Sequence, residues 1–246
     1  MQAAAVETTH ASPHVATTPM PVSTVADILT LHPQARHVFD RYDIDYGCVG
    51  DKTVAEVCRD MGLELAPFLG QLSATGGHDA SKPRWDTVPI PQLVRHIVDT
   101  CHRPLQEGLP LVLLRTRALL AAEGERMAGP LPRIVALLEA LLSEMVPHMQ
   151  EEETHLFPWI RQHSRHPDLP MPSLPRRLHA LMDEHEYAIG LLRQLRVVTH
   201  DYSVPVGKSD KWVVVWQGLA ELDATLHEHI HLENNVLFPR IPREGA

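Results

Sequence analysis

Cysteines, aromatic residues and long apolar runs are all scarce in this chain of 246 residues. The three cysteines, Cys48, Cys58 and Cys101, are too few for a disulfide framework and favour a reducing compartment. No apolar run reaches the roughly 18–20 residues of a membrane span. The N-terminus also lacks the charged and apolar regions of a secretory signal. We therefore expect a cytoplasmic protein that does not cross a membrane.

Positive charge is also in short supply. Lysine and arginine together number 22 against 31 aspartates and glutamates, which gives a formal net charge of −9. No continuous basic segment is present, so we expect no nucleic-acid partner. Hydrophobic residues make up 44% of the chain, enough for a sizeable core, which must be mainly aliphatic because aromatics are only 5%. The 17 histidines are the compositional excess that a function has to explain.

The first third of the chain is predicted to hold a small helical unit. Residues 1–22 show no periodicity, and we expect a disordered tail there. Residues 23–72 contain short amphipathic segments with helix start signals at Ser23 or Thr24 and at Thr53, and a stop signal at Gly62. Residues 73–87 are rich in Gly, Ser, Asp and Pro, which is typical of a linker between domains.

Residues 88–246 are predicted to form the main domain, an all-α, up-down-up-down four-helix bundle. Pro104 and Pro110 predict a local break or kink in the first helix. The segment WVVVW at 212–216 has strand-like composition, but its place inside a long helical pattern favours a helix. The four helices are expected at about residues 91–122, 131–162, 173–200 and 208–237.

One motif occurs twice in this domain. His148 and Glu152 are four residues apart, as are His229 and Glu233, and each glutamate is followed five residues later by Phe-Pro. Residues four apart lie on one face of a helix, so each motif directs one imidazole and one carboxylate to the same place. Two such helices facing each other would offer nitrogen and oxygen ligands suited to iron, manganese or zinc. The shared Phe-Pro indicates a duplicated helical hairpin.

The duplication predicts further ligands on the first and third helices. His185 lies in the apolar stripe of the third helix. The first helix offers His96 or His102, which are six residues apart and do not share a face, and spacing alone does not choose between them. Four histidines and two glutamates exceed the four ligands of a zinc ion, so they indicate a dinuclear site and favour iron. The glutamates are the expected bridges, because a carboxylate can bind two cations.

Most neighbouring residues are expected to have no chemical role. The Phe-Pro pairs should pack the end of the bundle and terminate a helical segment. Glu151 and Glu153 fall on other faces than Glu152 and should be solvated. Glu184 and Glu186, beside His185, are candidate proton sources. Structural or solvated roles are expected for the remaining histidines of the bundle, His155, His163, His166, His179, His200, His227 and His231.

Several segments resemble the repair-of-iron-centres (RIC) family, whose members have a hemerythrin-like bundle. These segments are EEETHLFP at 151–158, MDEHEYAIGLL at 182–192 and HIHLENNVLFPR at 229–240. In addition, Ile44–Gly50 is similar to the I-D-F-C-C-G-G segment of the short ScdA-type domain that precedes the bundle in this family. One departure is clear: Gly47-Cys48 stands where relatives often have two adjacent cysteines, so a paired-thiolate role is excluded.

The resemblance implies a cofactor of two iron ions bridged by carboxylates and by an oxo or hydroxo group. It also selects His102 over His96, since His102 precedes Leu109-Pro110 as in relatives. The implied ligands are His102, His148, Glu152, His185, His229 and Glu233.

The implied function is repair of iron-sulfur clusters damaged in nitrosative or oxidative stress, by iron donation, nitric oxide reduction, or both. Whether the protein is an enzyme, as a nitric oxide reductase would be, stays open, as does a homodimeric state. The expected partners are damaged iron-sulfur proteins and the gases nitric oxide and oxygen. The alternative is a hemerythrin-like protein that binds or senses oxygen or nitric oxide without turnover. Such carriers have a further histidine on the third helix, but Ile189 lies four residues after His185 here.

Overall fold

The computed structural model describes residues 18–76, 83–124, 129–163 and 173–241. Within these ranges the chain is helical and forms no β-strand, which confirms the all-α prediction. Most of the predicted tail lies outside the described residues, as does the middle of the predicted linker. No helix of the described part is long and apolar enough to span a membrane.

Four short α-helices and one 3₁₀ turn build the N-terminal unit. The Thr24 and Thr53 hydroxyls each accept a hydrogen bond from the backbone N–H three residues on, and the acidic side chain at that position accepts one from the threonine's own backbone N–H, so both helices start with a capping box. Gly62 ends the third helix with a positive φ of 66°. The elements are α1 (Val25–Leu31), η1 (Pro33–Ala35), α2 (Arg36–Arg41), α3 (Val54–Met61) and α4 (Leu65–Ala74).

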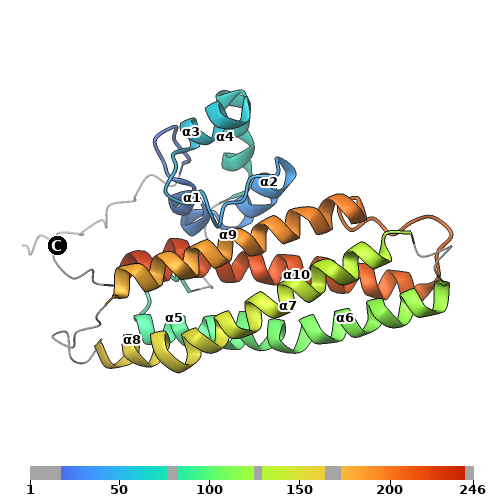
Figure 1. Ribbon diagram of the computed structural model, residues 1–246. Helices are drawn as coiled ribbons and strands as arrows, with labels where there is room; N and C mark the ends of the chain where they lie inside the picture. The colour runs from blue at the N-terminus through green and yellow to red at the C-terminus, as the bar shows by residue number, and fades with distance from the viewer. Residues whose placement is uncertain (1–17, 77–82, 125–128, 164–172, 242–246) are drawn as a thin grey trace, which may run out of the picture.

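Four long helical segments build the bundle (Figure 1). Three of these segments contain a π-helical turn. Pro104 is the second residue after the first π turn, and helix α6 continues through Pro110 without a break. The segment at 212–216 is helical, as predicted. In order, the segments are α5 (Ile90–Ile97), η2 (Val98–His102) and α6 (Arg103–Glu123); α7 (Leu131–Glu151), η3 (Glu152–Leu156) and α8 (Phe157–His163); α9 (Leu174–Thr199); and α10 (Asp210–His231), η4 (Leu232–Leu237) and the 3₁₀ turn η5 (Phe238–Arg240).

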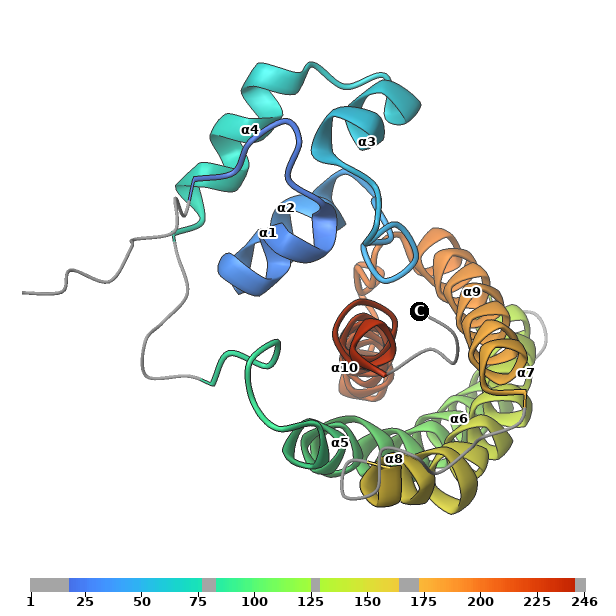
Figure 2. The same cartoon turned by 90° about the vertical axis from the view of Figure 1, so that its left-hand side faces the viewer.

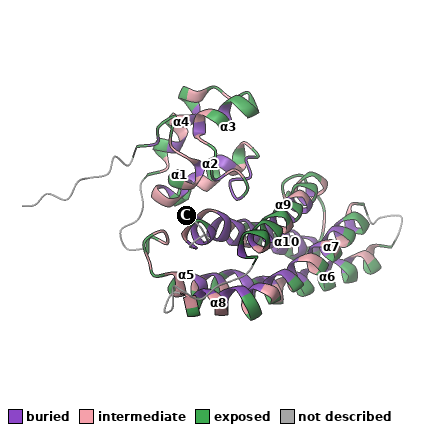
Figure 3. Cartoon of the chain, turned by 60° about the vertical axis from the view of Figure 1, so that its left-hand side comes forward, coloured by how far each residue is buried: buried purple, intermediate pink, exposed green. Residues whose placement is uncertain are grey.

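The bundle closes because α6 contacts both α7 and α10, while α9 contacts the same two helices from the other side. Figure 2, a view along the bundle, shows α10 lying between the other bundle helices and the N-terminal unit. Buried faces of the helices turn inward (Figure 3). Their apolar side chains form two separate clusters, one around Leu105, Met145 and Ile230 and the other around Cys101, Leu156 and Leu237. The polar residues of the duplicated motif occupy the layer between these clusters.

The N-terminal unit has its own core around Phe39 and Phe68 and is tied to α9 and α10 by charged residues. Asp45 accepts a hydrogen bond from Arg193 and contacts His227 at 3.5 Å. Arg36 approaches Glu228 at 3.4 Å.

A buried ionic network lies behind this contact. Arg196 donates two hydrogen bonds of 2.7 Å to the carboxylate of Asp223. His227 approaches the same carboxylate at 2.7 Å, and the Tyr202 hydroxyl donates to it. Burial opposes ionisation, yet the hydrogen bonds from Arg196 and His227 hold the pKa of Asp223 well below its usual value of 3.8. The network therefore stabilises the fold only while Asp223 is ionised.

We expect Asp223→Asn to lower the free energy of unfolding at pH 7 by about 3–5 kcal/mol, because Arg196 and His227 lose their anionic partner. The pKa of Asp223 is lowered by folding, so the stabilisation is present above pH 3.8 and is lost as the pH falls through the native pKa. Urea denaturation at pH 7 and at pH 3 measures the difference. Asp43→Asn is the matched control, since Asp43 is 69% exposed and 4.0 Å from Arg196. Equal losses for the two variants would contradict the role of Asp223.

Candidate metal centre

Each copy of the duplicated motif brings its histidine and glutamate into contact. His148 is on α7, and its Nε2 atom lies 3.3 Å from Oε2 of Glu152, the first residue of the π turn η3. His229 is on α10, and its Nε2 atom lies 3.1 Å from Oε2 of Glu233 in the π turn η4. All four side chains are fully buried. The predicted convergence of one nitrogen and one oxygen from each helix is present.

The first and third helices each add one imidazole. His102 ends the π turn η2, and its Nε2 atom is 3.2 Å from Nε2 of His229. His185 is on α9, and its Nε2 atom is 2.9 Å from Nε2 of His148. By contrast, His96 points away from the centre and stacks on Trp85 with ring centroids 3.8 Å apart. The structure therefore brings together all six residues that the family resemblance selected.

The two glutamates lie between two pairs of histidines. One pair is His102 with His229, and the other is His148 with His185. Glu152 is 3.5 Å from His102 and 3.3 Å from His148. Glu233 is likewise 3.5 Å from His102 and 3.3 Å from His185. Each carboxylate thus contacts both pairs, an arrangement that suits a bridging ligand.

The π turns are what places three of these side chains. His102, Glu152 and Glu233 all belong to the turns η2, η3 and η4. A π turn inserts one extra residue into a helix and rotates the following side chains relative to the preceding ones, and it is frequent at functional sites. Helical spacing alone could not reveal these turns.

Three of the four imidazoles hold their outer nitrogen in a hydrogen bond. Nδ1 of His102 is 3.0 Å from Glu153, and Nδ1 of His148 is 2.7 Å from Glu184. Nδ1 of His185 is 2.9 Å from Oδ1 of Asn234. Carboxylate and amide oxygens only accept, so each Nδ1 donates, and in the neutral imidazole this leaves the lone pair of Nε2 facing the centre. Outer partners of this kind orient histidine ligands in metal sites.

The role of Glu153 corrects the sequence-based expectation that it is solvated. Its carboxylate accepts from His102 and from Gln106, at 3.0 and 2.9 Å. Helix periodicity placed it off the face of Glu152, but the π turn brings it beside His102. Glu151 is likewise only partly exposed, and it pairs with Arg177 and His155.

The carboxylates of the centre are buried without hydrogen-bond partners. Both oxygens of Glu152 and both of Glu233 lack one among the described residues. Burial and the nearby Glu233 raise the pKa of Glu152, whereas contacts with His229, His102 and His185 lower the pKa of Glu233 despite its burial. Burial also lowers the pKa of His185 to about 4, which keeps it neutral. Converging lone pairs and orphaned carboxylates are unfavourable alone, and they fit a group of bound cations.

The Phe-Pro residues contact the centre, which corrects the expectation that they only close the bundle end. The ring of Phe157 is 5.4 Å from His102, and Phe238 stacks on His185 at 6.2 Å. Phe157 begins α8 and does not terminate the helical segment. Both rings are buried and shield the imidazoles from water.

The remaining sequence candidates lie outside the centre. His227 and His231 are buried, and their contacts are with Asp223 and Asn235. Cys101 is buried in the apolar cluster next to His102, Cys58 is in the N-terminal core, and Cys48 is exposed. His166 lies outside the described residues.

We expect Glu152→Gln to raise the stability of metal-free protein by about 1–3 kcal/mol at pH 7, because it removes an unsatisfied buried carboxyl beside Glu233. The pKa of Glu152 is raised by folding, so metal-free protein should lose stability as the pH rises above 4.5. With metal bound, Glu152→Gln should instead be less stable than the wild type, since the variant lacks a ligand. Thermal unfolding with chelator and with Fe²⁺ measures both. Glu144→Gln on the same helix is the control. A metal-free Glu152→Gln protein that is less stable than the metal-free wild type would contradict the prediction.

Comparisons with known proteins agree with the geometry. The profile of the Hemerythrin HHE cation binding domain matches residues 93–241, and ScdA_N, described as a domain of unknown function (DUF542), matches residues 22–75. The chain is 32% identical over 214 residues to the iron-sulfur cluster repair protein YtfE of Yersinia pseudotuberculosis serotype IB (strain PB1/+), covering 86% of this chain and 92% of that protein. It is 31% identical over the same shares to YtfE of Yersinia pestis (strain Pestoides F).

Proposed function

The chain belongs to the hemerythrin HHE cation-binding family, within the group of iron-sulfur cluster repair proteins, and from this membership we propose that it is a di-iron protein that repairs damaged iron-sulfur clusters. The observation that carries the proposal is the placement of two unsatisfied carboxylates between two pairs of buried imidazoles. Relatives named as repair proteins match across both the N-terminal unit and the bundle. The repair role therefore rests on more than the bundle alone.

The six residues divide the work of holding two iron ions. His102 and His229 would bind on one side and His148 and His185 on the other, with Glu152 and Glu233 as bridges. The two negative charges offset the repulsion between neighbouring cations, which four neutral imidazoles could not do. Bound iron would supply one-electron redox chemistry and open positions for nitric oxide or oxygen. The apolar clusters on both sides keep bulk water from the ligands.

Two activities fit this site. Iron donation would pass an ion to a damaged cluster, and the protein's contribution is to release it. Nitric oxide reduction would join two molecules of nitric oxide into nitrous oxide and water, with two protons and two electrons from an external thiol or protein reductant. Glu184 is half-exposed and accepts a hydrogen bond from His148, which lowers its pKa, so as an ionised group between solvent and the centre it would relay protons from water. Damaged iron-sulfur proteins and nitric oxide are the proposed partners in the cytoplasm.

Binding or sensing of a gas without turnover is the second candidate. It uses the same six residues. The position four residues after His185 is Ile189, which is 1% exposed and packs in the apolar cluster. A carrier of this fold would place another imidazole there, so the side chains present favour repair.

We expect purified protein to carry about two irons per chain, and Mössbauer spectra to show a carboxylate-bridged pair. Glu152→Ala combined with Glu233→Ala should abolish iron binding, because it removes both bridging groups. His96→Ala is the matched control, since His96 stacks on Trp85 outside the centre. Wild-type protein without iron, or iron content unchanged in the double variant, would contradict the di-iron site.

Ferrous protein should react with nitric oxide and restore activity to a nitric oxide-damaged iron-sulfur enzyme. The double variant should do neither, because both steps need the bridged pair. Nitrous oxide formation separates reduction from iron donation, and transfer of ⁵⁷Fe to the enzyme identifies donation. Reversible gas binding with neither product nor transfer would favour the sensing alternative.

A further inference from the structure

Asn234 lies between the N-terminal unit and the metal centre. It is in the π turn η4, next to Glu233, and it is buried. Its side-chain NH₂ donates to the backbone carbonyl of Gly47 at 3.1 Å. Its Oδ1 atom lies 2.9 Å from Nδ1 of His185. A single side chain therefore contacts both a loop of the N-terminal unit and a candidate ligand from the third bundle helix.

The two hydrogen bonds of Asn234 depend on each other. A backbone carbonyl can only accept, so the amide must turn its NH₂ group toward Gly47. This leaves Oδ1 facing His185, where it can only accept. Nδ1 of His185 must then carry a hydrogen, and Nε2 is directed toward His148 and the centre. The orientation of the ligand imidazole thus follows from the position of a carbonyl in the other unit.

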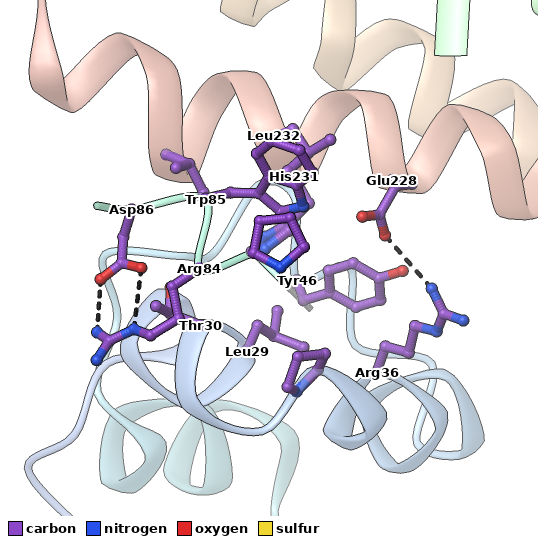
Figure 4. A pocket seen from close by; sticks show the side chains of 13 residues that line it. Leu29, Thr30, Arg36, Tyr46, Arg84, Trp85, Asp86, Glu228, His231 and Leu232 are labelled. Carbon is purple, nitrogen blue, oxygen red and sulfur yellow. Dashed lines mark hydrogen bonds and ion pairs between the residues drawn. The ribbon is translucent and has the colours of Figure 1, made fainter. Parts of the chain in front are cut away.

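Residues 44–50 form a loop that we call the docking loop. It lies close enough to the bundle to fix the position of the Gly47 carbonyl. A Cβ atom added at Gly47 would come within 2.7 Å of Ile230, and one at Gly50 within 1.8 Å of Asn235. Only residues without a side chain permit this approach. Asn235 donates to the carbonyl of Tyr46 at 2.9 Å. Figure 4 shows the Tyr46 ring against α10 beside His231.

The outer partner of His185 also differs in kind from those of the other ligands. His102 and His148 donate to Glu153 and Glu184, which belong to bundle segments. His185 alone among these three has a neutral partner, and that partner is held by a group outside the bundle. A carboxylate at this position would repel the carbonyl of Gly47, so an amide is the side chain that satisfies both contacts.

We propose that Asn234 is a positioning residue through which contact of the docking loop with the bundle orients His185 for metal binding. The proposal rests on the proposed function only in that the centre binds metal. Coupling of this kind is reciprocal. Loop contact strengthens metal binding, and metal bound at His185 holds Asn234 and therefore strengthens contact of the loop.

The test measures Fe²⁺ affinity of the full chain by anaerobic competition with a chelator. Asn234→Ala should weaken Fe²⁺ binding by about 10–100-fold, the usual effect of removing an outer partner of a metal ligand. Asn235→Ala is the matched control, because Asn235 is the next residue and bonds the same loop but does not contact His185. It should leave the affinity within about twofold. Asn234→Asp keeps an acceptor for His185 but loses the donor to Gly47, so its affinity should lie between those of Asn234→Ala and the wild type, and full wild-type affinity would show that the loop contact contributes nothing.

Hydrogen exchange of the docking loop provides the second readout. Fe²⁺ should slow exchange of the amides at 45–50 in the wild type and in Asn235→Ala, but not in Asn234→Ala or Asn234→Asp. Equal Fe²⁺ affinity in Asn234→Ala and Asn235→Ala, or metal-dependent protection of the loop that survives Asn234→Ala, would overturn the proposal while leaving the metal centre intact. A wild-type chain that binds no Fe²⁺ would instead contradict the centre itself.

Discussion

The structure depends on the burial of two carboxylates among four imidazoles, three of which hold their outer nitrogen in a hydrogen bond. Glu152 and Glu233 have no hydrogen-bond donors of their own, and His102, His148 and His185 donate their Nδ1 protons to partners outside the centre. Such a layer is costly without cations and favourable with them. The aliphatic clusters on either side of the layer exclude water and lower the local dielectric constant. They therefore increase both the energetic cost of the layer without cations and its stabilisation with them.

The outer contacts extend the same constraint to the rest of the molecule. Glu153 and Glu184 join bundle segments to the centre through the imidazoles that they hold, and Asn234 joins the N-terminal unit. Polar and ionic contacts link the two units, among them those of Asp45 with Arg193 and His227 and of Arg36 with Glu228. The strength of polar contacts depends on their geometry more than on the buried area. The position of the Gly47 carbonyl therefore affects His185, which lies one side chain away through Asn234.

Local sequence signals predicted the helices well. The capping residues Thr24 and Thr53 and the stop at Gly62 act within a few residues of themselves, and the structure contains all three. The long helices followed from apolar periodicity, and their ends lie within two residues or so of the predicted ones. Helix α6 continues through Pro110, because its packing against α7 and α10 retains the helix at a residue that cannot complete the backbone ladder.

By itself the sequence determined the two facing pairs, His148 with Glu152 and His229 with Glu233, since residues four apart on a helix must share a face. The choice of His102 over His96 needed family resemblance. Only the tertiary structure decided that Glu153 faces His102, that the Phe-Pro rings cover the imidazoles, and that Asn234 joins Gly47 to His185. These contacts join residues far apart in the chain or depend on π turns, and neither leaves a periodic signal.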